Sequence, residues 1–468
     1  MRSGKPSERS KREINDNKNI PNVAVFFPLV FILTYGIFTI ITGLEMWIGA
    51  IVVLFSAIAL HFITYTSFTI PIVLSVIVLS LTAPFFLIFP KAAIVATSGV
   101  IAYYIYRFYY TSSPLFVGSA VVYLVGTLLN LVFNSTPLPS PDAAQYYGRV
   151  RNFGTISEYL VHLIQLAQED ISLLKSSMQT FPAFYLPLYK SYGFESPAVF
   201  VVINMVLWVT TVLLFKELIK YYLTESANVS PGIVSAMLLL SPTAMYWSST
   251  FLKDITSVFL CMLATYLFFR KRAIMFLIVV LVATSIRLYS IAIISIYIAT
   301  IMWSPLLLGI GLFGSAIFTL IYTGNIVTLF NSILVFGYFF VSPHPVQIEN
   351  WLTPRLIPRL IEAVLYAGGL FISGRFAVTS RKLRNHYLIL TAGILIYSLV
   401  IVSVAYRYTV FQRGLPYGFG TAGENILRKM LPILPLIAVW MSITVSNMKY
   451  PRLSISSRNQ SNESSYRE

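Results

Sequence analysis

The sequence predicts an all-α protein, a polytopic bundle of about 12–14 transmembrane helices with both ends in the cytoplasm. Three observations support this prediction. Of the 468 residues, 57% are hydrophobic and only 11% are charged, and the mean hydropathy is +0.77. A soluble domain carries about 25% charged residues, so the composition indicates lipid as the solvent. The apolar residues form runs of near-membrane length, and Lys and Arg cluster between those runs.

The apolar runs define the predicted spans. Backbone polar groups in lipid must be satisfied within the segment, so roughly 20 apolar residues cross the hydrocarbon core as a helix. On that rule the predicted spans are 23–43, 46–64, 68–89, 92–106, 115–133, 197–215, 231–247, 255–269, 273–287, 288–304, 305–323, 360–378, 387–406 and 430–447. We expect 325–342 to be re-entrant or to lie outside the bilayer core. The polar ends, 1–20 and 448–468, predict disordered cytoplasmic tails around a membrane domain over 21–447.

Basic clusters set the predicted orientation, because short cytoplasmic loops carry an excess of Lys and Arg. Fourteen spans place every such cluster inside, and an even number of spans is required in any case. The clusters are the N-terminal tail, Lys216 with Lys220, Arg270–Arg272, Arg381–Arg384, and Lys449 with Arg452.

The same topology predicts three polar regions on the outer face: 134–196, 343–359 and 407–429. The first is the largest and contains SEYLVHLIQLAQEDISLL over 157–174. Its apolar residues recur at helical spacing, which predicts an amphipathic helix lying in the membrane interface.

Several kinds of chemistry are disfavoured by the composition. The single cysteine, Cys261, lies in an apolar run, so neither a disulfide framework nor a thiolate metal site is expected. The four histidines are scattered along the chain, and we predict no metal site built from them. The net charge of +16 is explained by topology signals, so we expect no nucleic-acid partner. No GxxxxGK phosphate loop is present, which argues against an ATP-driven pump.

Arginines on the predicted outer side are the strongest functional signal, because outer loops should be poor in basic residues. As a set they predict a site for the phosphate or diphosphate of a lipid, since guanidinium groups suit fixed, bidentate phosphate contacts. The alternative is that individual side chains snorkel or pair with acids such as Glu349 and Glu424. The predicted ligand-binding residues are Arg287, Arg407, Arg413, Arg428 and Arg149, together with Lys253, while Arg151, Arg355 and Arg359 lie on the same side.

Two scarce acids are the candidate catalytic residues. Asp142 lies in LPSPDAAQYYGRVRNF just outside a predicted span, and Asp254 lies where Lys253-Asp254 interrupts two apolar stretches. A carboxylate at a membrane-edge cavity can act as general base toward a sugar hydroxyl, or can hold a divalent cation. The alternative for both is helix capping, with Lys253 as a simple ion-pair partner of Asp254.

Tyrosines cluster in the same predicted outer loop. Tyr146 and Tyr147 follow Asp142 closely, and further tyrosines lie at Tyr185, Tyr189 and Tyr192. An interfacial aromatic belt is one explanation, and stacking against sugar rings is the other. On the second interpretation Tyr146 and Tyr147 belong to the substrate site.

Four segments of the chain resemble polytopic glycosyltransferases of the GT-C type, such as the mannosyl- and aminoarabinose-transferring membrane enzymes. They are PDAAQYY, FPAFYLPLYKSYGFESP leading into a span with Asn204, SPTAMYWSSTFLKD, and SIRLYS after the basic turn. The C-terminal segments SPHPVQIENW and GTAGENILRKMLPILP are similar to polysaccharide-assembly membrane proteins, including O-antigen polymerase-like ones. The likeness covers about half of the chain. In the family the acidic loop follows the first span, whereas four more spans precede it here.

The resemblance implies a transferase that uses a polyprenyl-phosphate-linked sugar, with Asp142 matching the acid of the family's first loop. We therefore expect a multi-pass protein of the plasma membrane whose partners are membrane lipid and a polyprenyl-phosphate-linked sugar. Two alternatives stay open: a polymerase of lipid-linked oligosaccharide repeats, and a transporter or flippase for a lipid-linked glycan. The sequence does not require a cofactor; a divalent cation held by a carboxylate is the one option that it leaves open.

Overall fold

The computed structural model describes residues 113–133, 140–153, 156–169, 197–343, 347–421 and 426–448, with isolated positions between 95 and 105 and at 138, 181, 182 and 185. Throughout these residues, every regular element is a helix, as the sequence predicts. The predicted spans 23–43, 46–64 and 68–89, most of 92–106, and the tails 1–20 and 448–468 (bar its first residue) lie outside the described residues.

Six helices in the described part of the chain are long and apolar enough to cross a membrane. They are α6 (Pro114–Phe133), α11 (Ala198–Tyr222), α18 (Pro305–Thr323), α21 (Ile357–Thr379), α22 (Arg381–Tyr406) and α24 (Leu434–Asn447, with its approach from Leu427). A seventh span results if the bent pair α14 and α15 is counted as one. The protein is therefore a membrane protein by the length and composition of its helices.

The chain divides into two compact units. Unit 1 comprises Met1–Phe215 and Ser235–Ser295, and unit 2 comprises Lys216–Val234 and Ile296–Glu468. The division falls within α11, α13 (Pro231–Leu240) and α17 (Ser290–Ile301), which continue from one unit into the other.

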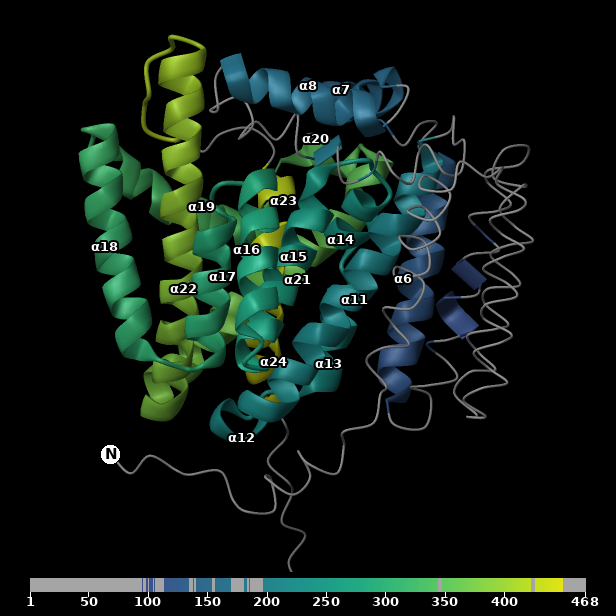
Figure 1. Cartoon of the computed structure of the whole chain (residues 1–468). Helices are drawn as coiled ribbons and strands as arrows, with labels where there is room; N and C mark the ends of the chain where they lie inside the picture. The colour runs from purple at the N-terminus through teal and green to yellow at the C-terminus, as the bar shows by residue number, and fades with distance from the viewer. Residues whose placement is uncertain are drawn as a thin grey trace, which may run out of the picture. The chain divides into compact units, whose positions relative to one another are not determined.

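Unit 1 contains the candidate site. Besides α6 and the first part of α11, it holds α7 (Pro141–Asn152), α8 (Ile156–Glu169), α14 (Pro242–Ser248), α15 (Lys253–Phe269) and α16 (Ala273–Ile286). The short helices α7 and α8 run across the direction of α6 (Figure 1). The helices α15 and α16 pack on each other, joined by the exposed basic turn Arg270–Arg272. One side of α16 is strongly exposed and apolar, with Ile274 76% and Leu281 71% accessible, as a lipid-facing helix requires.

Unit 2 is built around α22. The helices α18, α19 (Val327–Val341) and α21 all contact α22, and α24 contacts both α21 and α22. Unit 2 also holds several short helices: α12 (Thr224–Ala227), α20 (Ile348–Trp351), η1 (Pro354–Leu356), the π-helix η2 (Arg407–Gln412), α23 (Ile426–Lys429) and η3 (Leu431–Ile433). The exposed sides of α18 and α21 are apolar. Ile321 is 79%, Phe371 82% and Val378 85% exposed, which suits contact with lipid.

Within the described part of the chain, most predicted spans correspond to observed helices, but one does not. The run 231–247 was predicted as a single helix, and that is wrong: α13 ends at Leu240 and α14 begins at Pro242. The Ser241 hydroxyl caps α14 by accepting from the Ala244 amide, and Pro242 has no N–H to continue the earlier helix. The predicted segment 325–342 contains the short helix α19. The first part of the predicted amphipathic helix 157–174 is helical as α8, and 170–174 lies outside the described residues.

Candidate functional site

The site lies at a break in the helical path of unit 1. Helix α14 ends at Ser248, and α15 starts at Lys253 after a bend of 111°. The hydroxyls of Ser249 and Thr250 donate to the carbonyls of Tyr246 and Trp247 at 2.7 and 2.9 Å. The same two carbonyls also accept the backbone amides of Ser249 and Thr250, so side chains and backbone together stabilise the end of α14.

Helix α11 fixes the far side of the break. The fully buried amide of Asn204 donates to the Thr250 carbonyl at 2.6 Å. The Tyr185 hydroxyl donates to Asn204 Oδ1 at 3.4 Å and shares a 2.6 Å hydrogen bond with the hydroxyl of Thr256 on α15. Burial raises the pKa of Tyr185, so this phenol stays neutral and keeps its proton for hydrogen bonding.

Aromatic rings close the site beneath α7. Phe251, in the break, stacks on Phe200 at 4.4 Å between centroids and also contacts Phe181 and Tyr185. Tyr146 packs edge-on against Phe181 at 5.0 Å. The break is therefore surrounded by apolar rings, which lowers the local dielectric and strengthens the electrostatic interactions inside it.

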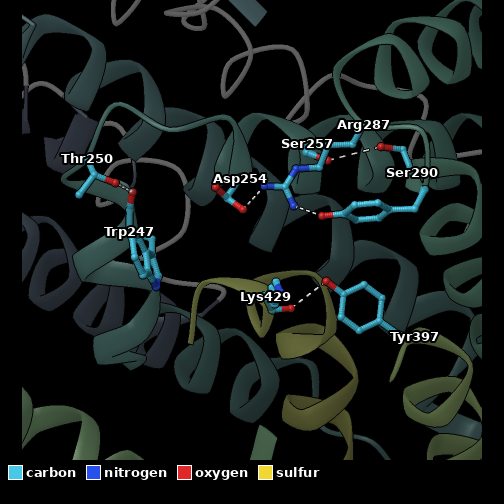
Figure 2. Close-up of polar contacts among 9 residues, drawn as sticks. Trp247, Thr250, Asp254, Ser257, Arg287, Ser290, Tyr397 and Lys429 are labelled. Carbon is cyan, nitrogen blue, oxygen red and sulfur yellow. Dashed lines mark hydrogen bonds and ion pairs between the residues drawn. The ribbon is translucent and has the colours of Figure 1, made fainter. Parts of the chain in front are cut away.

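A buried ion pair joins the two ends of the site. Asp254, the second residue of α15, pairs with Arg287, which directly follows the end of α16 (Figure 2). The side chains are only 1% and 6% exposed. Arg287 also donates to the hydroxyl of Tyr289. Nearby, the Ser290 hydroxyl donates to the Ala283 carbonyl at 2.9 Å and contacts that of Ser257 at 3.4 Å, which ties the start of α17 to α15 and α16 (Figure 2).

Asp142 and its neighbours approach the same region from α7. Lys253 lies over the ring of Tyr146, with Nζ 5.6 Å from the centroid. Asp142 precedes Tyr146 by four residues and therefore lies on the same face of α7, half-buried. Tyr147 is buried against Phe200 at 6.3 Å. Arg149, in the last turn of α7, is exposed.

Neither aspartate is the N-cap residue of its helix. The N-cap of α7 is Ser140, whose hydroxyl accepts from the Ala143 amide at 3.3 Å, and Asp142 lies inside the first turn. The N-cap of α15 is Leu252, which makes no side-chain cap. Asp254 pairs with an arginine from another helix, so its position serves a tertiary contact.

The three remaining predicted arginines belong to unit 2. Arg407 and Arg413, at either end of η2, are exposed, and Arg428 on α23 is half-buried. Arg413 stacks on Tyr408 at 4.6 Å and donates to its hydroxyl at 2.8 Å. These arginines thus have surroundings unlike those of Arg287.

An asparagine in unit 2 holds the segment 418–421, which lies in the chain between Arg413 and Arg428. Asn331 on α19 is fully buried; it donates to the carbonyls of Gly418 and Thr421 at 3.0 and 3.3 Å and accepts from the Gly420 amide at 2.8 Å. The Tyr417 hydroxyl adds a 2.8 Å bond to the Thr421 carbonyl. The sequence analysis missed this contact, although a lone Asn in an apolar run is the signal that would have found it.

Neither a metal cluster nor a known relative identifies the site. No group of three or more His, Cys, Asp or Glu side chains suited to a metal ion occurs among the residues that the structure describes. Comparison of the chain with protein-family models, with curated proteins and with solved structures gives no match.

Proposed function

We propose that the chain is a membrane glycosyltransferase that takes a sugar from a polyprenyl-phosphate-linked donor and passes it to a glycan, lipid or protein acceptor at the outer face of the plasma membrane. The observation that supports this best is the buried Asp254–Arg287 pair at the break between α14 and α15. Ionisable groups are expensive within membrane bundles and generally mark substrate sites. Replacing such a pair by apolar residues would often stabilise a fold, which favours a functional reason for its presence.

Arg287 is the proposed phosphate ligand. Its planar guanidinium has five N–H donors in a fixed fork, and the Asp254 carboxylate and Tyr289 hydroxyl hold that fork in one orientation. A donor phosphate would bind an already oriented group, so little side-chain entropy is lost on binding. Lys253, which precedes Asp254 at the start of α15, supplies a second cation. The exposed arginines Arg149, Arg407 and Arg413 and the half-buried Arg428 remain candidates for attracting the anionic donor.

In the proposed reaction the acceptor hydroxyl oxygen attacks the anomeric carbon of the donor sugar. The bond from that carbon to the phosphate oxygen breaks, and its electron pair leaves with the phosphate. Asp142 takes the proton from the acceptor hydroxyl, while Arg287 stabilises the charge growing on the phosphate. Tyr146 and Tyr147 lie on the Asp142 helix and supply the adjacent ring surfaces. Asp254 positions Arg287.

The test is turnover of purified protein in nanodiscs with a panel of polyprenyl-phosphate sugars. Arg287→Lys keeps the positive charge but removes the planar guanidinium with its paired N–H donors, and we expect turnover to fall by a factor of about 10²–10³. Asp142→Asn should lose at least as much. Arg270→Gln and Glu169→Gln remove exposed charges from unit 1 and should match wild type.

Two results would contradict the proposal. Wild-type turnover in Asp142→Asn would remove that residue from catalysis. Movement of the intact donor across the membrane, with its sugar–phosphate bond unbroken, would indicate a transporter in its place.

A further inference from the structure

A polar stripe runs along the otherwise apolar helix α6. Tyr123, Thr127 and Asn130 are spaced at i, i+4 and i+7, so they lie on one face. Tyr123 and Thr127 are fully buried. In a helix of membrane-spanning length, such a stripe requires polar partners on the neighbouring helix.

The neighbouring helix is α14, which contacts α6 closely. The Asn130 amide donates to the Ser249 hydroxyl. Gly126, on the same side of α6, lies so close to Met245 that an added Cβ would be 2.6 Å from Sδ. The stripe of α6 therefore faces the end of α14, immediately before the break that carries Asp254.

Three hydroxyls at this contact make no hydrogen bond of normal geometry with any residue that the structure describes. They are those of Tyr123, Thr127 and Ser248, all fully buried. Ser248 and Thr127 are the polar neighbours of the Tyr123 hydroxyl, yet none of the three oxygens makes a bond of normal geometry. Buried polar groups in native proteins almost always have a partner, and leaving one unmade is destabilising. Three such groups beside one another leave hydrogen-bonding capacity that a further polar group could satisfy.

We infer that these hydroxyls form a subsite for the sugar of the lipid-linked donor, an inference that rests on the proposed function. Each hydroxyl can both donate and accept, as a sugar hydroxyl does, and the three are neutral. That chemistry suits a polyol and neither an ion nor a hydrocarbon chain. Ser248 and Asp254 lie on the same short segment, so a donor whose phosphate binds Arg287 has its sugar near α6 and α14. The donor phosphate and donor sugar thus have separate protein partners.

The test measures binding of two probes to purified protein in nanodiscs: a glycosylated polyprenyl phosphate and the same polyprenyl phosphate without sugar. Tyr123→Phe, Thr127→Val and Ser248→Ala each remove one hydroxyl with little change in shape. We expect each to weaken binding of the glycosylated probe about 3–10-fold and to leave the sugar-free probe unchanged. Thr210→Val is the matched control, because that hydroxyl donates to the Val206 carbonyl of its own helix at 2.8 Å.

The outcomes separate this inference from the proposed function. Equal weakening of both probes, or no weakening of either, overturns the subsite; unchanged affinity with raised thermal stability would mean that the hydroxyls bind water only. A wild type that binds the glycosylated probe more tightly than the sugar-free one through these hydroxyls, yet transfers no sugar, overturns the transferase and retains the subsite. A wild type that binds neither probe overturns both.

Discussion

Arginine occurs in two different settings in this protein. In unit 1, Arg287 is buried against the Asp254 carboxylate and the Tyr289 hydroxyl. In unit 2, Arg413 is exposed and stacks on Tyr408. Both were predicted to bind the same phosphate, because both follow apolar runs on the predicted outer side. The contribution of an arginine to stability therefore depends on its burial and its partners in the folded protein, and an unusual position in the sequence does not determine it.

The largest difference between the two settings should appear in stability. Arg287→Ala leaves the Asp254 carboxylate buried without its counter-ion, and we expect a loss of about 3–5 kcal/mol in the free energy of unfolding. Arg413→Ala removes an exposed contact and should cost less than about 1 kcal/mol. Unfolding of both variants in one detergent measures the contrast.

A double replacement sharpens this result. Asp254→Leu combined with Arg287→Met removes both charges, and stability should return close to wild type while sugar transfer stays lost. A double variant as unstable as Arg287→Ala would contradict the explanation, since the cost would then come from packing and not from an uncompensated charge.

The segment 417–421 of unit 2 is held by neutral hydrogen bonds, and we expect their removal to have an intermediate effect. Asn331→Leu removes both donors to the Gly418 and Thr421 carbonyls and the acceptor for the Gly420 amide. We expect local protection against hydrogen exchange at 417–421 to fall by about 1–3 kcal/mol. Asn447→Ala is the control, because that amide donates only within α24, to the Ile443 carbonyl at 2.7 Å. Unchanged protection at 417–421 would mean that Asn331 does not hold this segment.

The sequence predicted the helices well and named Asp254 and Arg287 as candidates, but it did not predict that these two side chains pair. Apolar run length is a local property, so α6, α18 and α22 are found at their predicted places. The break at Ser241-Pro242 was missed because the whole run 231–247 is apolar. An N-cap serine followed by a proline is a helix-start signal of only two residues within that run. Pairing of Asp254 with Arg287 spans 33 positions, and no periodicity reports which distant residues meet. The helical spacing of Tyr123, Thr127 and Asn130 on α6 is visible in the sequence. Polar residues without charge are common in apolar helices, however, so this spacing alone did not indicate a site.

The smallest predicted difference concerns two tyrosines, one in each region. Burial raises the pKa of both Tyr185 and Tyr417, so at alkaline pH each phenol stays neutral in the folded state at pH values that ionise it in the unfolded chain. The contribution of each phenol to the free energy of unfolding is therefore complete below about pH 10, and it is lost as the pH rises through the higher pKa of the folded state. Tyr185 contacts Asn204 and Thr256, whereas Tyr417 donates to one carbonyl. Tyr185→Phe should cost about 1–2 kcal/mol at neutral pH and Tyr417→Phe about 0.5–1 kcal/mol. Unfolding measured from neutral to alkaline pH should show a shallower decline in Tyr185→Phe than in wild type; an identical decline would place the alkaline sensitivity in other groups.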